Sequence, residues 1–478
     1  MNPMRRQLGV LGAAALSLAI MAPTAAMALN GSLAASIAGT AVPLSFVLAL
    51  VTIALVAYAF IEFARQYATA GSVYTFNGVA LGARTGFLSG WALLFTYLAF
   101  AAASAAETGA FFQSFVGLLG VHIWWVWPAL VTAVLVWVLG TRDISLSTRT
   151  TLVIEGLSIL AIVVLAIVIV AHGGDSGLTA QPFAIGSGGL SKVGLASVFA
   201  FLSFAGFEGA ATLGEETADP KRSIPRAIAA AVFAAGIFYV VISYVQSVGF
   251  GLSAAGVQKF ASSSAPLADL STRYAGTPMA VVIMAGATVS AFACTLAGAT
   301  AAARMLLTLG RDGLLPSSLS RVDERSGSPT TATSVAVGVI VVAVLGFGFA
   351  GSDGSAVFGY LGTIGVLSLL LVYLVTQVGA IKLFGSTGRW RGVTFVIPVL
   401  AILLLGYTLY ANVYPVPAAP FNVFPYLVVA WLLIGVALSF ARPTAIRRVA
   451  EDLVAQTTHA HAAGEHTGVV PGRAAGPG

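Results

Sequence analysis

Three glutamates lie within apolar stretches of the sequence: Glu107, Glu155 and Glu208. An unpaired carboxylate is costly at membrane depth, so such residues usually have a partner or a function. A buried carboxylate can bind an ammonium group or exchange a proton. For Glu155 the simpler interpretation is a structural pairing with a loop arginine. For Glu107 it is a packed, partnered group, with selection of a cation as the alternative.

Glu208 has the strongest claim to chemistry because glycines surround it. Gly206 and Gly209 flank it in the run FLSFAGFEG, and glycine tolerates backbone conformations that other residues resist. We therefore expect an apolar helix to unwind between Ser203 and Gly209. Such unwinding is tolerated where the freed backbone groups line a cavity or are buried in protein. Glu208 would then act in gating or ion coupling, or would hold the unwound backbone by hydrogen bonds.

A second interruption is expected near the N-terminus. The run MAPTAA, residues 21–26, places a proline among small residues within the apolar stretch 8–29. Proline removes an N–H and frees a carbonyl group. Amide N–H groups at a half-helix end favour anions, and loose carbonyls favour cations. Paired breaks indicate the binding site of a secondary transporter; the alternative is two unrelated kinks in packed helices.

The amino-acid composition indicates what kind of helices contain these two breaks. Only 8% of the 478 residues are charged and 58% are hydrophobic, which leaves too few charges for a water-facing surface. A spanning helix needs about 20 apolar residues. The sequence therefore predicts an all-α polytopic membrane protein with about twelve transmembrane helices. They are expected at residues 8–29, 41–64, 85–115, 123–140, 151–171, 193–214, 227–250, 278–309, 332–350, 357–382, 393–412 and 421–441.

The positions of the breaks, in the first and the sixth span, predict two five-helix repeats of opposite orientation. A removable signal peptide is an alternative for the first span. Apolar character resumes directly after it, so we interpret it as a retained helix. The expected parts are one transmembrane domain over 1–441, made of repeat one at 8–171, repeat two at 193–382 and two added helices at 393–441.

Lysine and arginine set the orientation. In the twelve-span layout nearly all of them fall on one side of the membrane, and only Lys192, Lys259 and Arg273 fall on the other. The positive-inside rule then places both termini in the cytoplasm, with the protein in the cytoplasmic membrane. Residues 442–478 are small and polar, which predicts a disordered cytoplasmic tail. Its three histidines lack the further ligands of a metal site, so no metal is expected.

Three motifs occur in the order found in one transporter superfamily. They are EFAR with AGSVY within 62–74, FAGFE, GEET and DPKRSIPRAI within 204–228, and AR, GRDGLLP and GSP within 303–329. On these motifs the chain resembles the amino acid–polyamine–organocation (APC) superfamily over about residues 5–441. That resemblance implies a fold with broken first and sixth helices.

The resemblance also implies a site for an amino acid between the two breaks. The substrate's carboxylate would meet backbone N–H groups, its ammonium would meet carbonyl groups, and Phe207 or Phe204 would act as a gate. Many relatives carry Gly-Ser-Gly at the first break, where this chain has Ala-Pro-Thr. The expected substrate-binding residues are Met21, Ala22, Pro23, Thr24 and Ala25 at the first break, and Phe204, Ala205, Gly206 and Phe207 at the second.

The same resemblance does not identify the ion whose gradient drives transport. Several relatives place a lysine in the fifth helix, where this chain aligns Ser158. Coupling through that lysine is therefore absent, and the coupling ion is H⁺ or Na⁺, with no cofactor expected. The residues considered for coupling or gating are Glu208, Ser158 and Glu107.

The predicted function is a secondary active permease that moves an amino acid by alternating access, through ion coupling or exchange. A polyamine or organic-cation carrier, with Glu208 or Glu107 binding the amine, is the alternative within transport. A membrane enzyme or a non-transporting sensor would need a catalytic cluster or a soluble domain, and the sequence shows neither. The expected partners are a small substrate and membrane lipid. The net charge of +6 fits helix orientation rather than nucleic-acid binding.

Overall fold

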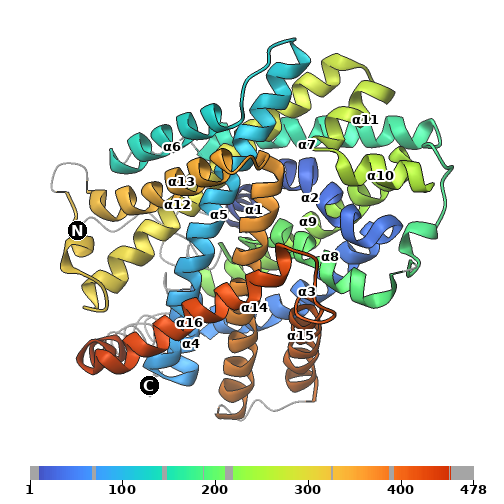
Figure 1. The fold of residues 1–478 in the computed structure, drawn as a ribbon. Helices are drawn as coiled ribbons and strands as arrows, with labels where there is room; N and C mark the ends of the chain where they lie inside the picture. The colour runs from blue at the N-terminus through green and yellow to red at the C-terminus, as the bar shows by residue number, and fades with distance from the viewer. Residues whose placement is uncertain are drawn as a thin grey trace, which may run out of the picture.

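The fold was obtained as a computed structural model, which describes residues 10–66, 72–142, 148–186, 188–209, 219–323, 327–386, 392–451 and 453. Within these residues the regular structure is helical throughout (Figure 1). Short 3₁₀ turns at Gly39–Ala41, Gln181–Phe183, Ser317–Ser320 and Phe421–Val423 join longer elements, and a further one covers residues 207–209. The α-helices are α1 (Val10–Met21), α2 (Pro23–Ala38), α3 (Val42–Gln66), α4 (Ser72–Leu81), α5 (Ala83–Leu118), α6 (Val126–Thr141), α7 (Thr148–Ala171), α8 (Gly189–Phe204), α9 (Pro220–Phe250), α10 (Ala254–Ser262), α11 (Pro266–Tyr274), α12 (Thr277–Arg311), α13 (Thr330–Phe349), α14 (Gly354–Ser386), α15 (Gly392–Ala411) and α16 (Phe424–Ala441).

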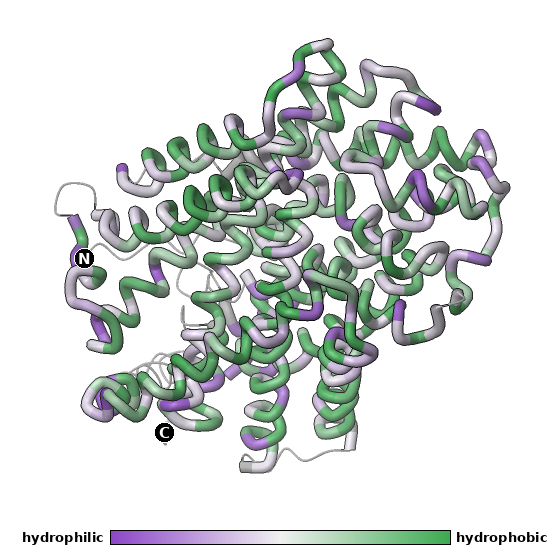
Figure 2. The backbone as a smooth tube through the Cα atoms, viewed as in Figure 1, coloured by the Kyte–Doolittle hydropathy of each residue, from purple (hydrophilic) through white to green (hydrophobic). Residues whose placement is uncertain are grey.

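The helices account for the predicted spans. Among the described residues, ten helical stretches are long and apolar enough to cross a membrane, and α6 is a shorter apolar helix. One stretch, Pro23–Gln66, contains the end of the first predicted span and all of the second, separated by the turn at Gly39–Ala41. Each of the twelve predicted spans therefore overlaps one helix or, for the first span, the two helices α1 and α2, which confirms the fold class. Apolar residues run along the helices, and polar ones gather toward helix ends and connections (Figure 2).

Helices five spans apart in the chain pack against each other. The break-bearing pair α2 and α8 is in contact, and so are the pairs α3 and α9, α5 and α12, and α6 and α13. Cross contacts also match, because α1 touches α9 and the counterpart α8 touches α3. Two structurally equivalent repeats would give such matched contacts, and the division into repeats stays a prediction. The two added helices lie outside them, with α15 against α14 and α3, and α16 against α5 and α14.

Basic residues gather at one end of the bundle, which we call the basic end. There the Arg84 guanidinium lies 4.6 Å from the centre of the Phe440 ring, and Arg442 Nη1 donates a 2.7 Å hydrogen bond to the Gly313 carbonyl. These contacts join the start of α5, the segment after α12 and the end of α16. The connection that holds α10 and α11 packs on α2 and α12 instead.

The segment after α16 differs from the predicted disordered tail. Residues 443–451 are helical, and Ala445, Ile446, Val449 and Leu453 are buried at the basic end. Their spacing places them on one face of a helix, so burial of that face offsets the entropy lost on ordering. Residues 454–478, which include the three tail histidines, lie outside the described part of the chain.

Candidate functional site

The first helix breaks at one residue. Helix α1 ends at Met21, and α2 begins at Pro23, whose fixed φ suits a first helical position. Ala22 between them is left-handed, with φ 46° and ψ 61°, a conformation that is costly for a residue with a Cβ. The break predicted over residues 21–26 is thus present, but it is narrower because the chain is helical again from residue 23.

The sixth span breaks after Phe204, the last residue of α8. Ala205 is extended, with φ −57° and ψ 128°, and Gly206 has φ +99°, which glycine adopts without steric cost. Residues 207–209 then form a short 3₁₀ turn, in which the Gly209 N–H bonds the Gly206 carbonyl at 2.9 Å. The predicted unwinding between residues 203 and 209 is confirmed. The GEET motif at 214–217 lies outside the described residues.

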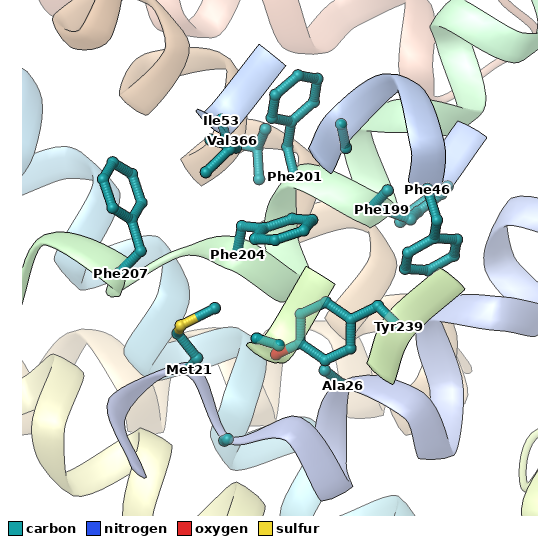
Figure 3. Close-up of a cluster of buried hydrophobic side chains, with 14 of the residues drawn as sticks. Met21, Ala26, Phe46, Ile53, Phe199, Phe201, Phe204, Phe207, Tyr239 and Val366 are labelled. Carbon is teal, nitrogen blue, oxygen red and sulfur yellow. The ribbon is translucent and has the colours of Figure 1, made fainter. Parts of the chain in front are cut away.

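The two breaks lie against each other. Ile20 at the end of α1 fills the space beside both glycines, since a Cβ on Gly206 or Gly209 would come within 2.4 Å or 2.6 Å of its side chain. Ser17 Oγ donates to the Phe207 carbonyl at 3.3 Å. Figure 3 shows Met21, Phe204 and Phe207 gathered where the two chain segments meet. The sequence-predicted binding residues of both breaks therefore form one cluster, and their role in binding stays a prediction.

Protein groups occupy the N–H donors at the start of α2. The Thr24 N–H donates to Glu155 Oε1 at 2.8 Å, and the Ala25 N–H donates to Ser290 Oγ at 3.4 Å. The Ala26 N–H bonds the Ala22 carbonyl at 3.0 Å. These are the donors expected to meet a substrate carboxylate. A carboxylate of the protein itself now holds the first of them.

The sequence predicted that Glu155 pairs with a loop arginine, and the structure shows a different partner. Its side chain is buried, with 7% exposure, and binds the first break instead. One signal could have found it. Glu155 lies three residues before Ser158, the position aligned with the coupling lysine of relatives, and so lies on the same face of the fifth span.

Aromatic rings cover the second break. Phe207 and Phe204 are fully buried. Phe207 lies 5.3 Å from Phe60 on α3 and 5.5 Å from Tyr373 on α14, measured between ring centres, and the latter two rings are 5.6 Å apart. Phe204 meets Tyr239 of α9 edge to face at 5.2 Å. Both rings are therefore packed over the second break, and their role as a gate stays a prediction.

The three candidates for coupling occupy different surroundings. Glu208 accepts a 2.9 Å hydrogen bond from the Tyr373 hydroxyl. Ser158 Oγ bonds the Ile154 carbonyl of its own helix at 2.8 Å and packs tightly against Gly286 of α12. Glu107 on α5 is 2% exposed, and its Oε1 has no hydrogen-bond partner among the described residues. The sequence predicted a packed, partnered group, and the structure confirms the packing but shows no partner for this oxygen in the part of the chain that it describes.

This geometry has a counterpart among known proteins. The model of the amino acid permease family matches residues 12–445. The chain belongs to the amino acid permease family. Its members are transporters and not enzymes, so this permease is a multi-pass membrane transporter. The resemblance stated from the motifs is thereby confirmed.

Two relatives of the permease are a bacterial transporter and a bacterial permease by name. A methylthioribose transporter of Bacillus subtilis is 27% identical over 436 residues, covering 87% of this chain and 89% of the relative. The branched-chain amino acid permease BcaP of the same organism is 28% identical over 347 residues, covering 69% and 72%. Small organic molecules are thus the substrates named for these relatives.

A solved structure shares the fold. The manganese transporter of Eremococcus coleocola superposes with a TM-score of 0.58 over 94% of this chain and 99% of its own, at 12% sequence identity. At this identity the likeness concerns architecture alone.

Proposed function

We propose that this permease is a secondary active transporter that moves an amino acid across the cytoplasmic membrane by alternating access. The observation that carries the proposal is the direct contact between the two helix breaks, through Ile20, Gly206 and the bond from Ser17 to Phe207. Backbone groups of two helix breaks that meet at membrane depth suit a small zwitterion. The driving force would be an ion gradient or exchange, because no phosphate-binding motif occurs in the sequence.

Contacts on both sides of the breaks support alternating access. Toward the basic end, the rings of Phe60, Phe207 and Tyr373 close the path. Toward the other end, Asn30 Nδ2 bonds Ser203 Oγ at 2.7 Å, which joins α2 to α8, and Gln246 Nε2 bonds the Met27 carbonyl at 2.6 Å. We propose that each set opens in turn while the other stays closed.

An apolar amino acid fits the surroundings best. Met21, Phe204, Phe207 and Tyr239 present mostly apolar surface at the breaks (Figure 3). Such surface stabilises an apolar side chain by about 25 cal/mol per Å² buried. The relative named for branched-chain amino acids supports the same choice.

A carrier of organic cations is the second candidate. Glu107, Glu155 and Glu208 are all buried, and none of them forms an ion pair among the described residues. An amine could supply the missing positive charge. The substitution Glu208→Gln separates the two candidates. It would abolish binding of the amine in a cation carrier, whereas an amino acid carrier would keep binding and lose coupling.

The direct test is transport by purified protein in proteoliposomes. Uptake or counterflow of L-leucine, measured under a proton gradient, a sodium gradient and no gradient, should be saturable and absent from protein-free vesicles. A thermal-shift screen of all proteinogenic amino acids and common diamines would identify other binders, because a ligand of the folded state raises its stability. Lack of both binding and transport for every amino acid would contradict the proposal.

Both termini are proposed to be cytoplasmic, with the basic end facing the cytoplasm. The support is the gathering of arginines there, which follows the positive-inside rule. Reporter fusions at either terminus, active only in the cytoplasm or only outside it, would test this orientation.

A further inference from the structure

The start of α2 is an anion site that the protein fills itself. A helix N-terminus favours a carboxylate because its N–H groups point outward and its dipole is positive there. Pro23 has no N–H, and the next three N–H groups are taken by Glu155, Ser290 and Ala22. In the proposed function, the carboxylate of the bound amino acid accepts hydrogen bonds from these same N–H groups.

A second observation indicates a ligand at this place. The hydroxyl of Tyr239 is fully buried and has no hydrogen-bond partner among the described residues. It interacts electrostatically with Glu155, and in Figure 3 the Tyr239 ring lies beside Ala26 in the first turn of α2. Burying a polar group without a partner is costly, and such groups usually await a ligand or water. The site therefore contains a hydroxyl group that can form a hydrogen bond to a ligand and forms none to the described protein residues.

We propose that Glu155 is a built-in stand-in for the carboxylate of the substrate, which binds only after Glu155 has taken up a proton. The proposal rests on the proposed function. Two ionised carboxylates sharing the Thr24 N–H would repel each other in surroundings of low polarity. Neutralising Glu155 removes that repulsion and weakens its bond to the backbone.

Each transport cycle moves one proton and exchanges one hydrogen bond of the Thr24 N–H. A proton from the water on the side of entry adds to the Glu155 carboxylate. The hydrogen bond from Thr24 N–H to Oε1 breaks, and one from the same N–H to the substrate's carboxylate forms. On the side of release the substrate leaves, the proton departs to the water there, and the bond from Thr24 to Glu155 re-forms. One proton thus travels with each amino acid in the same direction.

Few other ionisable groups face Glu155. Tyr239 on α9 and Cys294 on α12 interact with it electrostatically, and Cys294 also interacts with Glu107 of α5. Helices α1 and α2 carry no ionisable side chain. The ionisable side chains of α11 lie toward the end of the bundle opposite the basic end. There Arg273 pairs with Asp175 in the connection after α7. The hydrogen bond that Arg273 donates to Asp175 raises the pKa of Arg273, which keeps its positive charge. Among the buried carboxylates it is Glu155 that accepts a hydrogen bond from the first break, so proton uptake on substrate binding is assigned to it.

The test measures protons taken up during binding. Purified full-length protein in weakly buffered detergent solution is mixed with L-leucine, or with the proteinogenic amino acid that gives the largest thermal shift, and a pH dye reports the exchange. About one proton should be taken up per bound molecule, and affinity should fall up to tenfold for each pH unit above the titration of Glu155. L-Leucinamide, which lacks the carboxylate, should bind without proton uptake.

Glu155→Gln should bind leucine with no proton uptake and with an affinity independent of pH. The matched control is Glu62→Gln, which alters a glutamate paired with Arg65 away from the breaks and should keep the uptake. If Glu155→Gln does not fold, the wild-type protein carries the test. Binding of leucine without proton uptake overturns this inference alone. Equal uptake with leucinamide, or loss of leucinamide binding in Glu155→Gln, also overturns it. Absence of binding by any amino acid overturns it together with the proposed function.

Discussion

The hydroxyl of Tyr373 donates a 2.9 Å hydrogen bond to Glu208 Oε2, which ties α14 to the break that follows α8. Both side chains are buried, so water does not compete for the bond. The Tyr373 ring also packs against Phe207, the residue directly before Glu208. Movement of this break must therefore change both the packing and the hydrogen bonding of one tyrosine.

Replacing Tyr373 by phenylalanine should destabilise the protein by about 1–3 kcal/mol, because Glu208 would lose a buried donor while the ring packing stays. Thermal unfolding of the purified variant measures the loss. The control is Tyr410→Phe, where the side chain is 57% exposed and little change is expected. Equal stability of the two variants would contradict the importance of the bond. A double-mutant cycle with Glu208→Gln should give a coupling energy of about 0.5–3 kcal/mol.

Phe207→Ala should open the path from the basic end. It removes one ring of the three that meet there and should cost about 3–5 kcal/mol of stability. The single cysteine of the chain, Cys294, reports the opening, since its Sγ lies 3.9 Å from the Ile20 carbonyl beside the first break. Its rate of modification by a water-soluble maleimide should rise several-fold in Phe207→Ala.

Phe233→Ala serves as the control for that experiment, because Phe233 is 54% exposed on α9 and should leave the maleimide rate unchanged. A rate in Phe207→Ala no higher than in the control would show that the aromatic rings do not close the path.

Local sequence signals sufficed for the spans and the breaks. Hydropathy located every span because lipid imposes the same length and apolar character on each. The breaks followed from Pro23 and Gly206, whose backbone properties act at their own positions. The narrow width of the first break did not follow, because Ala22 adopts a left-handed conformation that its residue type disfavours.

Local sequence signals could not predict contacts between residues that lie far apart in the chain. Thr24 and Glu155 are 131 residues apart, and their hydrogen bond depends on how α7 is rotated about its axis. Both faces of a lipid-embedded helix are apolar, so hydropathy carries little information on that rotation. The helix at 443–451 was missed for another reason. Its buried face has helical spacing, but the polar composition of the whole tail outweighed that short pattern.

This C-terminal helix should stabilise the basic end. Val449 is 1% exposed in a cluster that includes Leu314 and Leu319. Val449→Ser should therefore lower the free energy of unfolding by about 1–3 kcal/mol. Arg447, exposed on the opposite face, provides the control: Arg447→Ser should change stability by less than about 0.5 kcal/mol. If thermal unfolding gave the same midpoint for both variants, the segment would not be docked in solution.

Gly206→Ala should impair transport more than any nearby glycine substitution that leaves the break untouched. Its φ of +99° strains any residue with a Cβ by about 1–3 kcal/mol, and the new Cβ would lie 2.4 Å from Ile20 Cγ2. Combining it with Ile20→Ala should restore stability only in part, because the clash is relieved and the backbone strain is not. Gly338→Ala is the matched control, since α13 is regular there and nothing lies within 4 Å of the added atom. That change should be neutral or stabilise by about 0.5–1 kcal/mol. Equal uptake of L-leucine by the two single variants would mean that the second break needs no glycine.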